Sequence, residues 1–186
     1  MSSAELVLVR HADTDWTASG QHTGHTDLPL NEAGRVAAVR LGPKLAGWSF
    51  SAVWCSPLRR AAETCELAGY GERAQRRDEL IEWDYGAYEG VTSEQIEAQR
   101  PAWDLWRDGC PGGEAASDVG ARADTVLAAL PEQGCVLAFS HGHFLRVLIA
   151  RWLDLEPADG ALFLLSPGAI SVLGHEHGRR VLRRLG

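Results

Sequence analysis

The chain has 186 residues, enough to bury a sizeable core, and it is most simply one domain spanning residues 1–186. Its composition, 45% hydrophobic and 23% charged residues, is that of a globular protein rather than a disordered segment. The 18 basic and 25 acidic residues give a net charge of −7, which argues against general binding to nucleic acid or to acidic membranes.

Neither a membrane segment nor an export signal is visible in the sequence. No apolar run approaches the roughly 18 residues of a membrane span, and the first residues lack the basic and apolar regions of a secretory signal. The four cysteines form no C-x-x-C pair, so we expect free thiols rather than disulfides or a zinc site. These features predict a cytoplasmic protein.

The first predicted element is a buried strand near the N-terminus. Residues 6–9 are branched and apolar, and the run ends abruptly in Arg10 and His11. Residues 12–30 are rich in Gly, Thr, Asp and His without a period, which indicates a long loop over that strand end. Asn31 then caps a predicted helix that Gly47 closes.

A second strand and helix follow. Residues 52–55 are a short apolar strand, and Ser56-Pro57 is predicted to cap and open the helix that carries Arg60. Residues 76–81 have the pattern of a polar edge strand that leads to Glu82.

The next part of the chain is predicted to be a short helical lid at about residues 91–113. Thr92 and Gln95 have the spacing of a capping box, and the Cys-Pro-Gly-Gly turn at 110–113 ends the excursion. On a helix, Trp103 and Trp106 would share a face, and we expect them to pack the lid onto the sheet rather than to stack on a sugar. A helix is predicted at 115–130.

The last third of the chain repeats the pattern of the N-terminus. Residues 135–139 are a strong strand that ends in Ser140-His141-Gly142-His143 and runs into a helix at 144–153. Residues 161–165, 169–173 and 179–185 are predicted strands. Strands that alternate with helices indicate a three-layer α/β/α sandwich with a mostly parallel central sheet.

Four side chains suited to phosphate follow the ends of three separate predicted strands. They are Arg10, His11, Arg60 and His141, and the carboxyl ends of parallel strands meet at one edge of a sheet. Each alone has a plain structural explanation, because such a histidine is commonly hydrogen-bonded within the fold and such an arginine is commonly solvated. Together they favour a phosphoryl group, whose oxygens match the forked donors of arginine.

Four ordered segments resemble the histidine phosphatase superfamily, also called phosphoglycerate-mutase-like, and they span nearly the whole chain. They are Arg10-His11-Ala12 with Thr14, Trp16 and the later Thr23-Gly24; Ser56-Pro57-Leu58-Arg59-Arg60-Ala61-Ala62-Glu63-Thr64; Glu82 with Tyr85-Gly86; and Ser140-His141-Gly142. The resemblance implies the phosphoglycerate-mutase-like α/β/α fold.

The resemblance also implies roles for the matched positions. His11 would be the nucleophile that forms a phosphohistidine, and Glu82 would protonate the leaving oxygen and then activate water. Arg10, Arg60 and His141 would hold the phosphoryl group, without a metal or other cofactor. The residues implied to lie around the substrate are Thr17, Thr23, Gly24, Tyr85 and Gly142.

Two positions depart from the family pattern. Ala12 stands where the family usually has glycine, and Thr17 where it often has asparagine. Glycine beside a phosphate frequently allows close approach of the backbone, so the methyl group of Ala12 could reduce turnover. Thr17 keeps a hydroxyl donor, so a phosphate contact there can survive.

A narrower resemblance concerns the branch that contains fungal sedoheptulose-1,7-bisphosphatases and bacterial acid-phosphatase relatives. It rests on residues 82–90, 103–109, His141-Gly142-His143 with Arg146, and 168–173. In that branch a second phosphate meets basic residues, for which Arg146 and His177 are the candidates here and Arg107 a weaker one. The alternative is that Arg146 is an exposed helix residue and His177 a turn residue.

The sequence therefore predicts a metal-independent phosphomonoesterase for small phosphorylated metabolites such as sugar phosphates or bisphosphates. Because Glu82 must carry a proton in the first step, an acidic to neutral pH optimum is expected. The alternatives are a phosphoglycerate mutase that depends on 2,3-bisphosphoglycerate, which the short lid disfavours, and a catalytically weak module that binds phosphorylated ligands. The oligomeric state stays open, with a homodimer as one option through the edges of the C-terminal strands.

Overall fold

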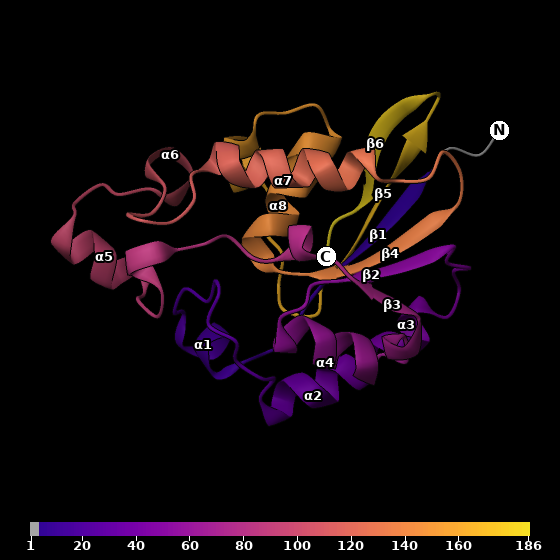
Figure 1. Cartoon of the computed structure of the whole chain (residues 1–186), viewed down its shortest axis with the longest axis horizontal. Helices are drawn as coiled ribbons and strands as arrows, with labels where there is room; N and C mark the ends of the chain where they lie inside the picture. Colours follow the sequence, from indigo (N-terminus) through magenta and orange to yellow (C-terminus); the bar gives the residue numbers. More distant parts are fainter. Residues whose placement is uncertain (1–3) are drawn as a thin grey trace.

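A computed structural model describes residues 4–186 as one six-stranded sheet between two layers of helices (Figure 1). The strands lie in the order β3-β2-β4-β1-β5-β6. Their bounds are β1 Glu5–Arg10, β2 Ala52–Cys55, β3 Ala74–Arg76, β4 Cys135–Ser140, β5 Ile170–Glu176 and β6 Arg179–Arg184.

The centre of the sheet is parallel and one side of it is antiparallel. The pairs β3-β2, β2-β4 and β4-β1 are parallel, whereas β1-β5 and β5-β6 are antiparallel. In the central pair Arg10 lies opposite Ser140, so the residues that follow β1 and β4 emerge side by side at one edge. The predicted three-layer fold with a mostly parallel sheet is confirmed.

Alternate side chains of the strands face the two helical layers. Leu6 and Leu8 pack in a core with α7 and α8, whereas Val7 and Val9 pack in a second core with α3 and α4. Figure 1 shows these layers above and below the sheet. The α-helices are α1 Asp15–Ser19, α2 Glu32–Val39, α3 Leu41–Leu45, α4 Arg59–Leu67, α5 Ser93–Gln99, α6 Leu105–Asp108, α7 Ala116–Ala128 and α8 Gly142–Trp152. The short 3₁₀ helices are η1 Gly71–Arg73, η2 Asp78–Leu80, η3 Gly86–Tyr88 and η4 Pro157–Leu162.

Four of the α-helices begin at a residue whose side chain accepts a hydrogen bond from a backbone N–H of the first turn: α1, α2, α5 and α6. The predicted capping box of Thr92 and Gln95 is present at the start of α5. Thr14 and Thr17 form a second box, which produces the short α1 inside the region predicted to be only a loop. Helices α5 and α6 extend away from the sheet in Figure 1.

Three local predictions need correction. The helix after β2 begins at Arg59 rather than at Pro57, since Leu58 is still extended, and the Ser56 hydroxyl contacts His141. The strand expected at 161–165 is absent from the described chain: η4 runs into this region, and Leu162 and Leu164 are 73% and 78% exposed. The edge strand expected at 76–81 ends at Arg76, where η2 soon follows.

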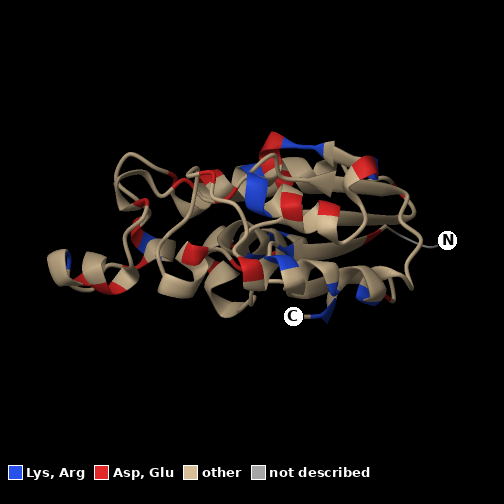
Figure 2. Cartoon of the chain, turned by 90° about the horizontal axis from the view of Figure 1, so that it is seen from below, with Lys and Arg blue, Asp and Glu red and all other residues tan. Residues whose placement is uncertain are grey.

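The surface shows no sign of a membrane segment in the part of the chain that the structure describes, where no helix is long and apolar enough to cross a bilayer. Acidic and basic residues are interspersed along the ribbon in Figure 2. All four cysteines are free, as predicted, and they are also buried.

Candidate active site

Four residues from three strand ends form the base of the site, which we call the floor: Arg10, His11, Arg60 and His141. Arg10 ends β1 and His11 follows it, while His141 follows β4 and precedes α8. The rings of His11 and His141 lie 5.2 Å apart between centroids. The sheet register thus brings the two imidazoles together, as the sequence predicts.

The His11 ring is held in one tautomer. Its Nδ1 lies 2.8 Å from the carbonyl oxygen of Ala12, which can only accept, so Nδ1 carries the proton and Nε2 has a free lone pair. Burial first, and then the charges of Arg60 and Arg10, hold the pKa of His11 well below its ordinary 6.5. The ring is therefore neutral, with a free lone pair on Nε2, even in mildly acidic solution.

Arg60 is fully buried at the start of α4. Its Nη2 donates to the carbonyl oxygens of Thr23 and Gly24 at 3.0 and 2.8 Å, and its Nη1 donates to that of Thr26 at 3.0 Å. Desolvation by burial lowers the pKa of Arg60, while nearby acidic groups, Glu82 first, raise it. Arg60 thus brings a cation under His11 and at the same time fastens the 23–26 loop.

Three buried nitrogen atoms of the floor have no hydrogen-bond partner within residues 4–186: Arg10 Nε, Arg60 Nε and His141 Nδ1. The other nitrogen of His141, Nε2, lies 2.7 Å from the hydroxyl oxygen of Ser56. Buried donors are nearly always satisfied in proteins, and such a cluster therefore suggests an anionic ligand. A tetrahedral anion with several oxygens could satisfy the group.

Glu82 lies beside the floor, in the segment between η2 and η3, and only 4% of it is exposed. Its Oε1 accepts hydrogen bonds from the backbone N–H groups of Trp83 and Phe144, and its Oε2 accepts one from His143 at 3.1 Å. Two of these donors, the N–H groups of His143 and Phe144, belong to the first turn of α8. The carboxylate is therefore fixed in direction.

Glu82 and His11 line the same cavity, which has a volume of about 230 Å³. Arg60 and His141 lie deeper and are not among its lining residues in the described chain. The cavity is lined by Arg10, His11, Trp16, Thr17, Gly20, Gln21, His22, Thr23, Glu82, Tyr85, Ser93, Gly142, His143, Arg146, Leu164 and Leu165. An open, small cavity of this kind suits a small metabolite.

One wall of the cavity carries an imidazole–phenol pair that the sequence did not single out. The hydroxyl of Tyr85 lies 2.5 Å from Nδ1 of His143. Burial raises the pKa of Tyr85 well above 10, and burial and then Arg146 hold the pKa of His143 well below 6.5, so both side chains are neutral. The ring of His22 lies 4.7 Å from that of Tyr85.

Sequence reasoning missed several lining residues for different reasons. His143 stands in the quoted His-Gly-His run, and its place in the first turn of a helix that follows a strand was the available signal. The others lie in loops or at short helices where no periodic pattern marks them: Gln21, His22 and Leu164 in loops, Trp16 in α1 and Ser93 at the start of α5.

Of the smaller residues predicted at the site, Thr17, Thr23 and Gly142 line the cavity, whereas Gly24 does not. Thr17 and Thr23 line the cavity, although the Thr17 hydroxyl also accepts from Thr14 N–H at 2.8 Å. Gly24 lies behind the wall, and its N–H donates to Glu89. A Cβ there would come within 2.6 Å of the carbonyl oxygen of Trp83, so only glycine fits. Gly142 lines the cavity beside the guanidinium of Arg10.

Ala12 does not place its methyl group in the cavity. The residue is fully buried in a small cluster with Leu30 and Ala38, and its N–H donates to the hydroxyl of Thr64. The methyl group that Ala12 has in addition to glycine therefore packs against Leu30 and against Ala38 of α2. This position removes the structural reason to expect reduced turnover.

Of the three basic candidates for a second phosphate, the structure places only Arg146 at the cavity. The prediction that His177 meets a second phosphate is wrong. Strand β5 starts beside Val9 at the cavity edge and runs antiparallel to β1. The turn after Glu176 therefore lies at the opposite edge of the sheet, about 20 Å away at about 3.3 Å per residue. Arg107 lies on the exposed face of α6, where it donates to Asp108.

The model of the histidine phosphatase superfamily (branch 1) matches residues 6–186. An acid phosphatase of Mycobacterium tuberculosis is 41% identical over 97% of this chain and 91% of its own length. The sedoheptulose 1,7-bisphosphatase of Saccharomyces cerevisiae is 33% identical over 80% of this chain and 67% of its own. A solved mycobacterial glucosyl-3-phosphoglycerate phosphatase superposes with a TM-score of 0.86 at 29% identity, over 97% of this chain and 98% of that one.

The chain belongs to the histidine phosphatase superfamily, as the resemblance of its four segments predicts. Its acid phosphatase and bisphosphatase relatives confirm the predicted enzyme class, a phosphoric monoester hydrolase.

Proposed function

We propose that the protein hydrolyses phosphate monoesters of small, sugar-type metabolites through a phosphohistidine at His11, without a metal. The observation that carries the proposal is the neutral His11, which lines the cavity and whose Nε2 is free, above three buried nitrogen atoms with no partner in the described chain. Such a floor offers a nucleophile together with donors for the oxygens of a phosphoryl group.

In the first step Nε2 of His11 attacks the phosphorus atom. The P–N bond forms as the ester P–O bond breaks, and the leaving oxygen takes a proton from the Glu82 carboxyl group. Arg10 and Arg60 stabilise the charge that spreads over the remaining phosphoryl oxygens, and His141 donates from Nδ1. The products of this step are the alcohol, the phosphohistidine and a Glu82 carboxylate.

In the second step a water molecule replaces the alcohol. Glu82, now a carboxylate, takes a proton from this water as its oxygen attacks phosphorus, and the P–N bond breaks. Inorganic phosphate leaves, and His11 and the protonated Glu82 are restored. A single carboxyl group serves both steps because its position is fixed by the start of α8.

The substrate class follows from the wall of the cavity and from the relatives. Relatives named acid phosphatase, sedoheptulose 1,7-bisphosphatase and glucosyl-3-phosphoglycerate phosphatase support a sugar phosphate. Arg146 lies at the cavity and can meet a second anionic group, which would favour a bisphosphate. Thr17 and Thr23 supply further polar groups, and Tyr85 closes one side.

Several broader predictions accompany this proposal. The chain would act as one domain, with residues 91–113 as a short lid over the cavity. Free, buried thiols are in keeping with a cytoplasmic location. A homodimer stays a prediction.

Release of phosphate from p-nitrophenyl phosphate in the presence of EDTA tests the proposal. We expect steady turnover that His11→Ala lowers by about 10³-fold or more, since loss of a nucleophile removes most of the rate enhancement. A matched control is His177→Ala, which should keep the wild-type rate. Phosphate binding without turnover by the wild type would show a ligand-binding module instead.

The mutase alternative has support of its own, because a 2,3-bisphosphoglycerate-dependent phosphoglycerate mutase of Brucella melitensis is 34% identical over 83% of this chain and 84% of its own length. A mutase would interconvert phosphoglycerates and need 2,3-bisphosphoglycerate. We expect net release of phosphate from a panel of sugar phosphates and no such requirement.

A further inference from the structure

Glu82 stands in a segment with almost no regular backbone structure, although it is among the most buried charged residues. After η2, residues 81–85 belong to neither a helix nor a strand. Buried carbonyl groups need donors, and here no neighbouring strand supplies them. Side chains must therefore hold this segment in place.

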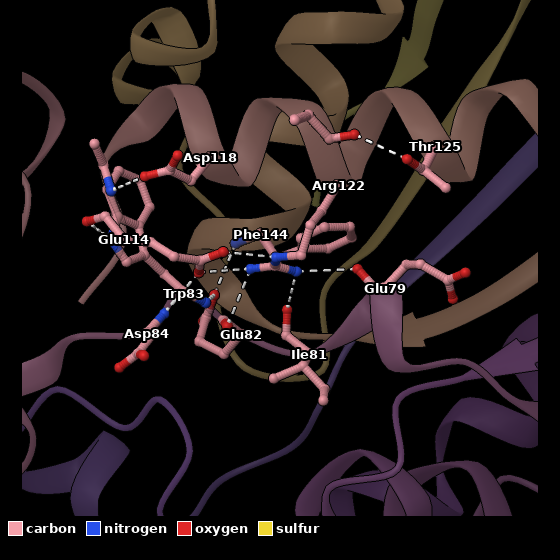
Figure 3. A network of polar contacts seen from close by, with 12 residues as sticks. Glu79, Ile81, Glu82, Trp83, Asp84, Glu114, Asp118, Arg122, Thr125 and Phe144 are labelled. Atoms are coloured by element: carbon pink, nitrogen blue, oxygen red, sulfur yellow. Dashed lines mark hydrogen bonds and ion pairs between the residues drawn. The ribbon is translucent and has the colours of Figure 1, made fainter. Parts of the chain in front are cut away.

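Arg122 of α7 supplies most of these donors. Its Nη1 donates to the carbonyl oxygens of Glu79 and Ile81 at 3.0 and 2.8 Å, and its Nη2 donates to that of Glu82 at 3.2 Å (Figure 3). The guanidinium carbon lies 5.0 Å from the centre of the Phe144 ring. One side chain thus holds three carbonyl groups at and before Glu82.

Glu114 holds the other side of the same segment. Its carboxylate accepts from Nε and Nη2 of Arg122 at 2.7 and 2.8 Å, and its Oε2 also accepts the N–H of Asp84 at 2.9 Å. The backbone carbonyl of Glu114 accepts from the indole N–H of Trp83, and its backbone N–H donates to Asp84. The ion pair therefore forms hydrogen bonds with the main chain both before and after Glu82.

Phe144 links this ion pair to the carboxylate itself. Its backbone N–H donates to Oε1 of Glu82 at 2.8 Å, and its ring lies under the guanidinium of Arg122. The main chain of Glu82 is thus fixed from α7 and its carboxylate from α8. With both ends held, the direction of the carboxylate relative to His11 depends on the Arg122–Glu114 pair.

We propose that the Arg122–Glu114 ion pair is the positioning unit for the acid–base carboxyl group of Glu82. This inference rests on the role of Glu82 in the proposed function. Neither side chain of the pair lines the cavity in the described chain, so both act through Glu82 rather than on the substrate. Their loss should impair proton transfer to the leaving oxygen more than it impairs binding of the phosphoryl group.

Leaving-group dependence separates this role from a purely structural one. Nitrophenolate departs without a proton, whereas the alkoxide of glycerol phosphate needs one from the general acid. The ratio kcat/KM reports the steps up to release of the alcohol, so subsequent hydrolysis of the phosphohistidine does not enter. A misplaced Glu82 should therefore lower kcat/KM for glycerol phosphate much more than for p-nitrophenyl phosphate.

The experiment measures both kcat/KM values for the wild type, Arg122→Gln, Arg122→Lys, Glu114→Gln and the reference variant Glu82→Gln. We expect Arg122→Gln and Glu114→Gln to lower the glycerol phosphate value about 10- to 100-fold, less than the roughly 10²- to 10⁴-fold of complete loss of a general acid because Glu82 itself is kept, and the nitrophenyl value by less than about threefold. Arg122→Lys keeps a charge but lacks the forked donors. Its kcat/KM for glycerol phosphate should therefore lie between the value of these two variants and that of the wild type.

The matched control is another ion pair of α7, which joins this helix to α8. Arg151 of α8 donates to both carboxylate oxygens of Asp124 of α7 at 2.9 and 3.2 Å, and neither residue contacts the Glu82 segment. Arg151→Gln should leave the ratio of the two kcat/KM values unchanged. An equal loss on both substrates in Arg122→Gln, Arg122→Lys and Glu114→Gln would overturn the positioning role.

Glu82→Gln distinguishes failure of this inference from failure of the proposed function. A leaving-group effect in Glu82→Gln that is missing from the Arg122 and Glu114 variants rejects only the positioning unit. If Glu82→Gln changes kcat/KM for both substrates by the same factor, Glu82 is not the general acid. The positioning role of the ion pair is then rejected as well.

Discussion

The floor of the cavity and the segments around it are built by different means. The positions of Arg10, His11 and His141 follow from the ladder between β1 and β4. The surrounding segments 23–26, 79–84 and 160–165, which we call the rim, have little regular structure, and arginine side chains hold their carbonyl groups. The floor is therefore rigid through the sheet, whereas the rim depends on a few long side chains.

Each part of the rim has its own arginine. Arg60 holds residues 23–26, Arg122 holds residues 79–82, and Arg146 donates from Nε and Nη2 to the carbonyls of Gly160 and Ala161. An arginine can satisfy several carbonyl groups at once because it has five N–H donors in a fixed plane. A single substitution can therefore loosen a whole segment of the rim while the sheet stays intact.

Arg60→Ala should have the largest effect of the substitutions that probe this comparison, because Arg60 belongs to the floor and also fastens the rim. We expect kcat/KM for p-nitrophenyl phosphate to fall about 10²- to 10³-fold, as for loss of a group that stabilises transition-state charge. Thr23, Gly24 and Thr26 would also lose their donor, so the free energy of unfolding should fall. Steady-state kinetics and urea denaturation measure the two effects.

Arg60→Lys separates the two parts of that loss. Lysine keeps the cation of the floor but cannot hold three carbonyl groups in one plane. If Arg60→Lys is about as unstable as Arg60→Ala but partly restores the rate, the charge of Arg60 serves catalysis in the floor. Its planar set of N–H donors then serves to hold the rim. A wild-type rate in Arg60→Ala would contradict the place of Arg60 in the floor.

The same contrast explains what the sequence could predict. The strands before His11 and His141 have continuous apolar runs, and parallel pairing then brings their ends together without knowledge of any side-chain contact. The rim has no such pattern: Arg122 lies 40 residues from Glu82, and nothing in its helical spacing shows which carbonyls it holds. His177 was misplaced for a related reason, because β5 runs antiparallel and the sequence does not show its direction.

The predicted lid at about residues 91–113 illustrates a different limit. Trp103 and Trp106 are spaced for one face of a helix, but α6 begins only at Leu105. Trp103 contacts His22 and Tyr88, whereas Trp106 packs against Trp83 and Arg146. Their packing role could be predicted from their size, while their partners are set by the rim.

Acid should destabilise the floor and the cavity wall together, since His11 and His141 of the floor and His143 of the wall have lowered pKa values. Burial is the largest cause for His11, His141 and His143, and arginine charges add to it. Below pH 6.5 the unfolded chain takes up protons at these residues and the folded chain does not, so stability is full above pH 6.5 and is lost as pH falls. The free energy of unfolding should drop by up to about 1.4 kcal/mol per pH unit for each histidine.

Urea denaturation at several pH values between 7.5 and 5 measures this slope. His143→Phe removes the histidine of the cavity wall, and its slope should be smaller by one histidine's share, even if the variant is less stable at every pH. A free energy of unfolding that does not change from pH 7.5 to 5 would show that the three imidazoles do not stay neutral in the folded state.

The smallest expected effect concerns Arg146, which fastens the rim and lines the cavity but lies outside the floor. We expect Arg146→Ala to raise KM for a sugar bisphosphate about tenfold, the equivalent of one charged contact, and to change KM for the monophosphate by less than about threefold. Arg146→Lys decides the cause. If the charge of Arg146 meets the second phosphate, lysine should keep the preference for the bisphosphate; if its fork only holds Gly160 and Ala161, lysine should behave like alanine on both substrates.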